Sequence, residues 1–224
     1  MPDTLRSALS PSMMCADLFA LRDTLRVFER CGIEYLHIDV MDGVFVPNYC
    51  LGPDYCRRLR EETRLPLDLH LMVVEPEKKL AYFPYGRGDI VSFHLESTEN
   101  AYPAIDMIAE KGALPFLAIN PDTPIERVVP YLPKLKGVLL MTVYPGFAGQ
   151  KMVPGALDRI QTLRKMMDEN GYGSLSIEVD GNVSFVNAPL MRNAGADLFV
   201  AGSSSVFAPG DLSENIRRMR GTLS

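Results

Sequence analysis

Histidine and aspartate residues alternate with apolar residues at two places in this sequence. His37 and Asp39 stand two positions apart, as do Asp68 and His70. The two-residue period of a β-strand points each pair to one face, opposite the apolar side chains between them. Imidazole nitrogens and carboxylate oxygens bind divalent transition ions, and one ion could satisfy several groups that are costly to bury unpaired. The spacing therefore predicts a metal site built from two strands.

A polar layer is the alternative interpretation, in which the histidines only hydrogen-bond neighbouring carboxylates, since a His-x-Asp pattern is a weak signal. Two observations favour the metal site. Two of the chain's three histidines stand in these settings, and Asp180 ends a third apolar segment just before Gly181. The remaining histidine, His94, ends another such segment; it could line the same site, but we expect a structural role.

The elements that position these residues are predicted to alternate between strand and helix. Residues 18–28 and 156–167 repeat apolar side chains at three- and four-residue steps, which is typical of amphipathic helices. Helical stretches between apolar segments indicate parallel strands, because only parallel neighbours need such long crossovers. The predicted strands are residues 8–11, 35–40, 67–72, 90–94, 114–119, 137–142, 175–180 and 198–201.

Eight such units in 224 residues predict an α/β fold, a single closed (β/α)8 or TIM barrel, rather than a doubly wound sheet. No linker or low-complexity stretch divides the sequence, so residues 1–224 are predicted to form one domain with a core of about 7–220. Barrel enzymes carry their chemistry where the strands end. The histidines and aspartates described above stand at or near those ends.

Glycine-rich turns follow the last three predicted strands, within residues 145–150, 181–182 and 202–204. Glycine lets backbone N–H groups turn towards an anion, and barrels often bind phosphate with the loops after their last two strands. Any one of these turns could merely punctuate a loop. Their shared location predicts a phosphate site.

Composition excludes several classes of partner. The net charge is −5 and no basic cluster stands out, so nucleic acid is not expected as a partner. No apolar run approaches the roughly 20 residues that a bilayer demands, and residues 1–7 lack the pattern of a signal peptide. We therefore expect no membrane partner and a cytoplasmic protein. The four cysteines follow no Cys-x-x-Cys spacing and are interpreted as reduced and packed.

Over residues 9–207 the sequence resembles the ribulose-phosphate 3-epimerase family. The resemblance is carried by residues 10–17, 37–48, 67–73, 120–124, 145–150, 178–181 and 201–203. It implies a (β/α)8 barrel of the ribulose-phosphate-binding type, with one divalent ion held by His37, Asp39, His70 and Asp180. Zinc is the expected ion, while iron(II), manganese and cobalt are compatible with such ligands. No organic cofactor is expected.

The resemblance also implies a mechanism and a phosphorylated ketose as substrate. The carbon-2 ketone acidifies the proton on carbon 3, and a divalent ion stabilises the enediolate that forms. Asp39 and Asp180 are implied to exchange the proton on opposite faces, each as base in one direction and acid in the other. The residues implied to contact the substrate are Ser12, Met41, Met72, Met141, Gly146, Phe147, Ala148, Gly149, Gly181, Asn182, Gly202 and Ser203. Taken without the family, the three methionines would be interpreted as core packing.

Three places depart from the commonest ribulose 5-phosphate pattern: the Met14–Cys15 pair, Ala148 and Asn182. They are similar to the D-allulose-6-phosphate 3-epimerase branch. We therefore expect D-allulose 6-phosphate, converted to D-fructose 6-phosphate, slightly ahead of D-ribulose 5-phosphate, converted to D-xylulose 5-phosphate. A lysine-dependent decarboxylase or aldolase and a non-catalytic sugar-phosphate sensor are the rival interpretations. The resemblance also implies a homo-oligomer.

Overall fold

The structure is a computed structural model and describes residues 6–224. Residues 1–5, with which the predicted domain 1–224 begins and on which part of the signal-peptide prediction depends, lie outside the described residues. Nine strands belong to one sheet: β1 (Ala8–Pro11), β2 (Leu36–Asp42), β3 (Tyr49–Cys50), β4 (Leu67–Met72), β5 (Ile90–His94), β6 (Leu114–Ile119), β7 (Gly137–Met141), β8 (Ser176–Asp180) and β9 (Leu198–Ala201).

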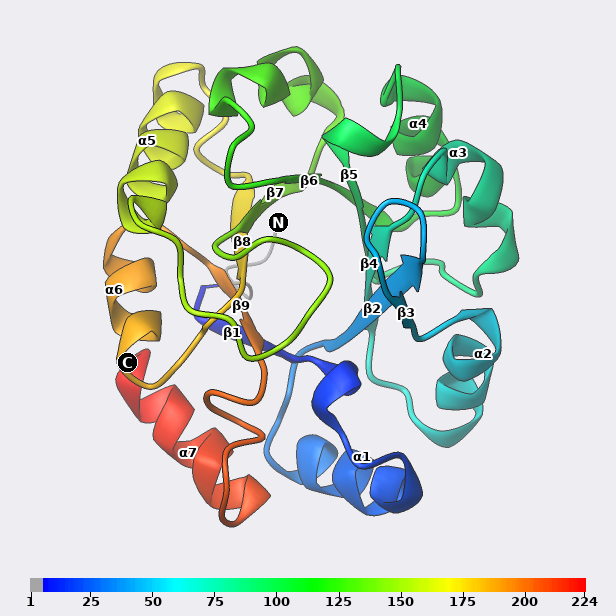
Figure 1. Cartoon of the computed structure of the whole chain (residues 1–224), viewed down its shortest axis with the longest axis vertical. Coiled ribbons are helices and arrows are strands. Elements are labelled where there is room, and N and C mark those ends of the chain that lie inside the picture. The colour runs from blue at the N-terminus through cyan, green and yellow to red at the C-terminus, as the bar shows by residue number, and fades with distance from the viewer. Residues whose placement is uncertain (1–5) are drawn as a thin grey trace.

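Eight of these strands form a closed parallel ring (Figure 1). Parallel pairing runs from β2 through β4 to β9 and on to β1. The ring closes between β1 and β2, where Ser12 forms a parallel bridge with His37 and the Tyr35 N–H donates to the Leu9 carbonyl at 3.3 Å. The short β3 pairs antiparallel with β2 outside the ring. The predicted (β/α)8 barrel is confirmed.

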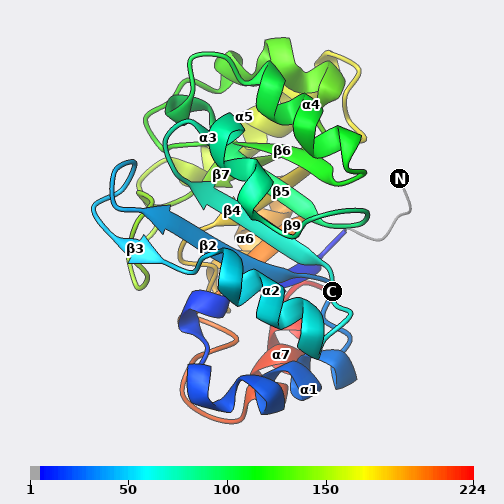
Figure 2. The same ribbon diagram turned by 90° about the vertical axis from the view of Figure 1, so that its right-hand side faces the viewer.

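Helices surround the ring in the order of the chain, as Figure 1 shows. They are α1 (Leu21–Arg30), α2 (Pro53–Glu62), α3 (Pro76–Lys79), α4 (Tyr102–Glu110), α5 (Ala156–Glu169), α6 (Asn187–Asn193) and α7 (Leu212–Thr222). A run of 3₁₀ turns at Ile125–Lys134 occupies the place of a helix between β6 and β7. In Figure 2 the hairpin of β2 and β3 projects at one end of the barrel and the C-terminus lies at the other.

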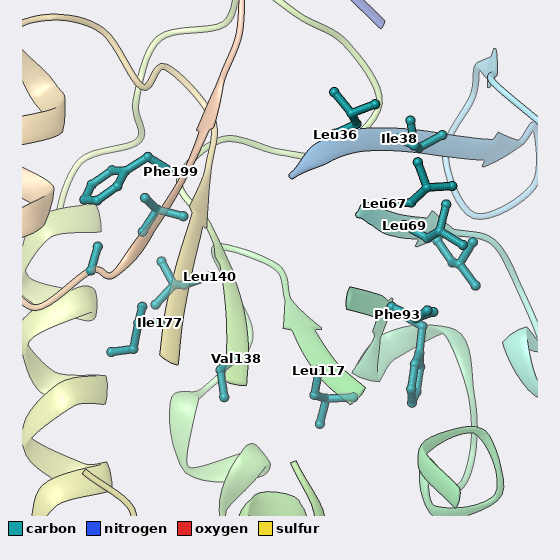
Figure 3. Close-up of a cluster of buried hydrophobic side chains, with 14 of the residues drawn as sticks. Leu36, Ile38, Leu67, Leu69, Phe93, Leu117, Val138, Leu140, Ile177 and Phe199 are labelled. Atoms are coloured by element: carbon teal, nitrogen blue, oxygen red, sulfur yellow. The ribbon is translucent and has the colours of Figure 1, made fainter. Parts of the chain in front are cut away.

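Outward-facing strand residues form the main core between the barrel and its helices (Figure 3). Leu36 and Ile38 of β2 and Leu67 and Leu69 of β4 are fully buried there. Removing one such side chain from water contributes roughly 1.5–3 kcal/mol, so this layer fixes which face of each strand points outwards. The residues that alternate with them must then point into the barrel.

The barrel interior is layered along its axis. Ala8, Ile90, Phe116 and Leu198 form an apolar plug at one end. Polar and charged side chains come next, and the strand ends open onto loops at the other end. None of the helices within residues 6–224 has both the length and the apolar character needed to cross a membrane.

Candidate active site

Four side chains converge at the open end of the barrel. His37 and Asp39 come from β2, His70 from β4 and Asp180 from the end of β8, and one ligand atom from each lies within 4.8 Å of the others. The register explains part of this convergence, because Asp39 and His70 are direct partners in the pairing of β2 with β4. The predicted group of four is therefore brought together, although its members are far apart in the sequence.

The spacing of these atoms fits a bound ion better than direct hydrogen bonds. His37 Nε2 lies 3.5 Å from Asp39 Oδ1 and 3.9 Å from Asp180 Oδ2, and His70 Nδ1 lies 3.7 and 3.5 Å from the same two oxygens. Ligands about 2.1 Å from a tetrahedrally bound ion stand about 3.4 Å apart. Both ring nitrogens are buried and neither has a hydrogen-bond partner among residues 6–224. The four side chains could thus hold one divalent ion.

A buried carboxylate sets the orientation of His37. Its Nδ1 lies 2.7 Å from Asp68 Oδ2, which also accepts a hydrogen bond from Ser10 Oγ at 2.7 Å. Burial raises the pKa of Asp68, but the charge of His37 and its hydrogen bond outweigh burial and lower the pKa, so Asp68 is an acceptor. His37 therefore donates from Nδ1, and its second nitrogen, Nε2, is the one that faces the other ligands.

Asp39 is held as a carboxylate. Burial works to raise its pKa, but the nearby imidazoles of His37 and His70 outweigh burial and hold the pKa well below its usual range. Ser12 Oγ donates to Asp39 Oδ2 at 2.7 Å. An ionised carboxylate with one anchored oxygen can accept a proton from a molecule in the barrel mouth.

Glu178 lies one layer deeper and is fully buried. Burial and the charge of Asp68 raise its pKa well above the ordinary value. His94 is also fully buried, and burial lowers its pKa to about 4, so its ring is neutral. In both groups burial favours the uncharged form next to the four converging side chains.

A cavity of about 280 Å³ opens above Asp39 and Asp180. Its walls include every residue predicted to contact substrate: Ser12, Met41, Met72, Met141, Gly146, Phe147, Ala148, Gly149, Gly181, Asn182, Gly202 and Ser203. The three methionines are at most 5% exposed and form an apolar wall. No lysine lines this cavity in the part of the chain that the structure describes, which leaves the lysine-dependent rival without its catalytic group.

Glycine is required by the backbone at two points of the cavity wall. Gly146 has φ +120° and Gly181 has φ +116°, and a Cβ on Gly181 would lie 2.6 Å from Val143 Cγ2. Asn182 follows with φ +49°, a left-handed conformation that asparagine tolerates. Its Oδ1 accepts a hydrogen bond from Asn187 Nδ2 at 2.7 Å. Asn182 therefore adopts a backbone conformation that a glycine would also adopt at this position.

Neighbouring loops hold residues 145–150 in place. Asn48 Nδ2 donates to the Gly146 carbonyl at 2.8 Å, and Gln150 Nε2 donates to the carbonyls of Tyr144 and Phe147 at 2.7 and 2.9 Å. The Tyr144 hydroxyl donates to the Asp122 carboxylate at 2.9 Å. These contacts fix the glycine-rich turn beside the cavity.

Sequence reasoning missed several side chains of this region. Met14, Cys15, Tyr144 and Gln150 line the cavity. Met14, Cys15 and Gln150 lie in segments that carry the family resemblance but were not predicted to line the site, and Tyr144 follows its strand without any alternation or ligand spacing. Asp68 was predicted to face the interior with His70, but its hydrogen bond to His37 depends on strand register, which the sequence does not display.

The sequence is similar to that of one family of known proteins. The sequence model described as the "Ribulose-phosphate 3 epimerase family" matches residues 8–207. A ribulose-phosphate 3-epimerase of Bacillus subtilis (strain 168) is 41% identical over 214 residues, which cover 96% of this chain and 98% of the relative. A chloroplastic ribulose-5-phosphate-3-epimerase of Arabidopsis thaliana is 40% identical over 95% of this chain and 75% of its own length.

A solved structure supports the fold alone. Orotidine 5'-phosphate decarboxylase from Pyrococcus horikoshii OT3 matches with a TM-score of 0.66 and 14% sequence identity, over 96% of this chain and 98% of that one.

Proposed function

Because the chain belongs to the ribulose-phosphate 3-epimerase family, and is thus an isomerase of the epimerase class, we propose that it interconverts D-ribulose 5-phosphate and D-xylulose 5-phosphate. The curated relatives from Bacillus subtilis and Arabidopsis thaliana carry names for the five-carbon reaction. They favour it over the D-allulose 6-phosphate that we expected first from the sequence. Asn182 is one of the departures that favoured the six-carbon sugar. Its left-handed backbone conformation explains the asparagine, so a longer sugar is not needed to explain it.

One divalent ion is proposed to be held by His37, Asp39, His70 and Asp180. The observation that carries this proposal is the pair of buried ring nitrogens, which have no hydrogen-bond partner in the described residues and face two carboxylates at 3.5–3.9 Å. Zinc suits two imidazoles and two carboxylates, and iron(II), manganese or cobalt would also fit. When bound, such an ion would draw electron density from the substrate ketone and make the proton on carbon 3 more acidic.

Asp39 and Asp180 are proposed to move the proton. They stand on strands that are three places apart in the ring, β2 and β8, so they approach the cavity from different sides. In one direction Asp39 removes the carbon-3 proton from one face and Asp180 returns a proton to the other. In the reverse direction the roles are exchanged, which is what inversion without an organic cofactor requires.

The glycine-rich turns after β7, β8 and β9 are proposed to bind the phosphate of the substrate. They line one side of the cavity together, including Gly146, Gly181, Gly202 and Ser203. Met41, Met72 and Met141 would cover the reacting carbons and exclude water without competing for the ion. The substrate would then lie with its phosphate under these turns and its ketone towards the four ligands.

Turnover of the two candidate sugars tests the proposed substrate. We expect kcat/KM for D-ribulose 5-phosphate to exceed that for D-allulose 6-phosphate by about 10–200-fold, the range over which a pocket discriminates one carbon. Both rates should be measured on one preparation loaded with zinc. Equal rates, or a preference for the six-carbon sugar, would overturn this choice and restore the allulose branch.

A further inference from the structure

A third imidazole lies directly behind His70. His94, at the end of β5, stacks on the His70 ring with centroids 5.0 Å apart and an interplanar angle of 28°. The two Nε2 atoms are 2.8 Å apart, so one ring donates to the other. On its far side His94 Nδ1 lies 3.4 Å from Glu96 Oε2, slightly beyond the usual hydrogen-bond length, and neither atom has a hydrogen-bond partner among residues 6–224.

Glu96 is itself fixed by the loop after β6. Its Oε1 accepts the backbone N–H of Asn120 at 2.9 Å and the hydroxyl of Thr123. A backbone N–H can only donate, so Oε1 must remain an acceptor and Oε2 must be the oxygen that faces His94. The loop after β6 therefore determines that Glu96 Oε2 is the atom next to His94 Nδ1.

We propose that His94 and Glu96 are positioning residues that keep His70 in its Nε2–H tautomer and so aim the lone pair of Nδ1 at the metal ligands. The proposal rests on the proposed function, since it assigns a role towards the same ion. Glu96 Oε2 accepts from His94 Nδ1–H, which leaves His94 Nε2 as an acceptor for His70 Nε2–H. If His94 Nε2 carried the proton instead, His70 Nδ1–H would point into the ligand group.

The two ligand histidines are thus oriented in different ways. His37 presents Nε2 and donates Nδ1–H directly to Asp68, whereas His70 presents Nδ1 and reaches a carboxylate only through His94. Metal-bound histidines generally donate their second N–H to such a partner, which fixes the tautomer. The His94 ring also packs against Phe45 at 4.7 Å between centroids, so packing alone is the competing explanation.

Glu96→Gln separates orientation from packing because it preserves shape. The Asn120 N–H still requires the side-chain oxygen of residue 96 as its acceptor. The new NH₂ group must therefore face His94 Nδ1, which has to accept a hydrogen bond from it. His94 then becomes the Nε2–H tautomer and His70 must carry its proton on Nδ1. We expect zinc affinity to fall about 10–100-fold, the usual effect of losing a partner of a metal-bound histidine. Glu99→Gln, on the exposed surface three residues away, is the matched control.

Nitrogen-15 NMR of the imidazoles gives the decisive readout, since the chain has only three histidines. In the wild-type protein with zinc we expect Nδ1–H on His37 and His94 and Nε2–H on His70, and we expect Glu99→Gln to match it. In Glu96→Gln the His94 proton should move to Nε2, with weaker zinc binding in a competition titration.

Wild-type His94 with its proton on Nε2 would overturn the proposal without any variant. Unchanged tautomers and unchanged zinc affinity in Glu96→Gln would also overturn it. A wild-type chain that binds no divalent ion, yet carries Nδ1–H on His94, would instead contradict the proposed metal site.

Discussion

At the scale of single residues, the chemistry of this barrel depends on one ring nitrogen of His37 and one of His70. Within the described part of the chain, His37 Nε2 and His70 Nδ1 are buried without hydrogen bonds, which costs several kcal/mol for groups of this kind unless something else binds them. Their second nitrogens are both engaged, by Asp68 and by His94. His37 Nε2 and His70 Nδ1 therefore both face the space between Asp39 and Asp180.

Asp180→Asn tests the role of one carboxylate. The amide is nearly isosteric but neither accepts a proton nor binds an ion as strongly, so we expect turnover to fall by about 10²–10⁴-fold, the contribution of a general acid–base group. Zinc affinity should fall as well, while the far-UV circular dichroism spectrum stays unchanged. Asp158→Asn, an exposed aspartate in the first turn of α5, should keep wild-type turnover. Normal turnover of Asp180→Asn would contradict the proposed mechanism.

Alternation along the strands predicted that His37, Asp39 and His70 face the barrel interior, because it needs only a period of two, whereas Asp180 was named as a ligand only through the resemblance to the family. The partners behind them could not be predicted. His37 meets Asp68 through the register of β2 with β4, and His94 meets His70 across β4 and β5 with an offset of two residues. Pairing register is a property of the closed ring, and nothing in one segment displays it.

At the scale of elements, a glycine on β7 controls the packing of the barrel interior. Gly137 pairs with Phe116 of β6, and a Cβ at Gly137 would lie 2.4 Å from two atoms of that ring and 2.7 Å from the Ser176 carbonyl oxygen. The carbonyl belongs to the neighbouring strand and cannot move freely. The phenyl ring, part of the apolar plug, occupies the space that any other side chain would need.

Gly137→Ala is therefore expected to lower the free energy of unfolding by about 1–3 kcal/mol, the usual cost of overpacking a core. Urea denaturation monitored by circular dichroism measures this change. Gly221→Ala is the control, because Gly221 lies in α7 with open space around it. Alanine favours a helix by roughly 0.5–1 kcal/mol over glycine, so that variant should be at least as stable as the wild type. Equal stabilities of Gly137→Ala and the wild type would contradict the packing described here.

All eight ring strands were predicted within two residues of their observed ends, because each combines an apolar run with flanking turn residues. The two-residue β3 was not predicted, since two residues display no period. Residues 125–134 form 3₁₀ turns containing Pro130 and Pro133, which break the repeat that identifies a helix. Short or proline-broken elements depend on contacts with the rest of the barrel.

At the scale of the whole molecule, the ion would connect three strands contributed by distant parts of the chain. Because it binds only the folded protein, zinc at about 100 times its dissociation constant should add about 2.7 kcal/mol of stability. For a domain of this size that raises the melting temperature by about 5–11 °C, and a chelator should reverse the increase. The chelated protein with added magnesium is the control, since magnesium prefers oxygen ligands. No increase with any transition ion would contradict the metal site.

The subunit number and the compartment remain predictions from the sequence. We expect a homo-oligomer, and light scattering coupled to size-exclusion chromatography would measure the mass in solution directly. A mass equal to the 24.9 kDa of one chain would contradict this expectation.

Solvent labelling tests the central claim, that two carboxylates exchange the carbon-3 proton on opposite faces. D-ribulose 5-phosphate should be converted in D₂O and the product examined by proton NMR. Because carboxylic acid protons exchange with solvent, the account predicts D-xylulose 5-phosphate that carries deuterium at carbon 3. Product that retains the original hydrogen at carbon 3 would contradict it.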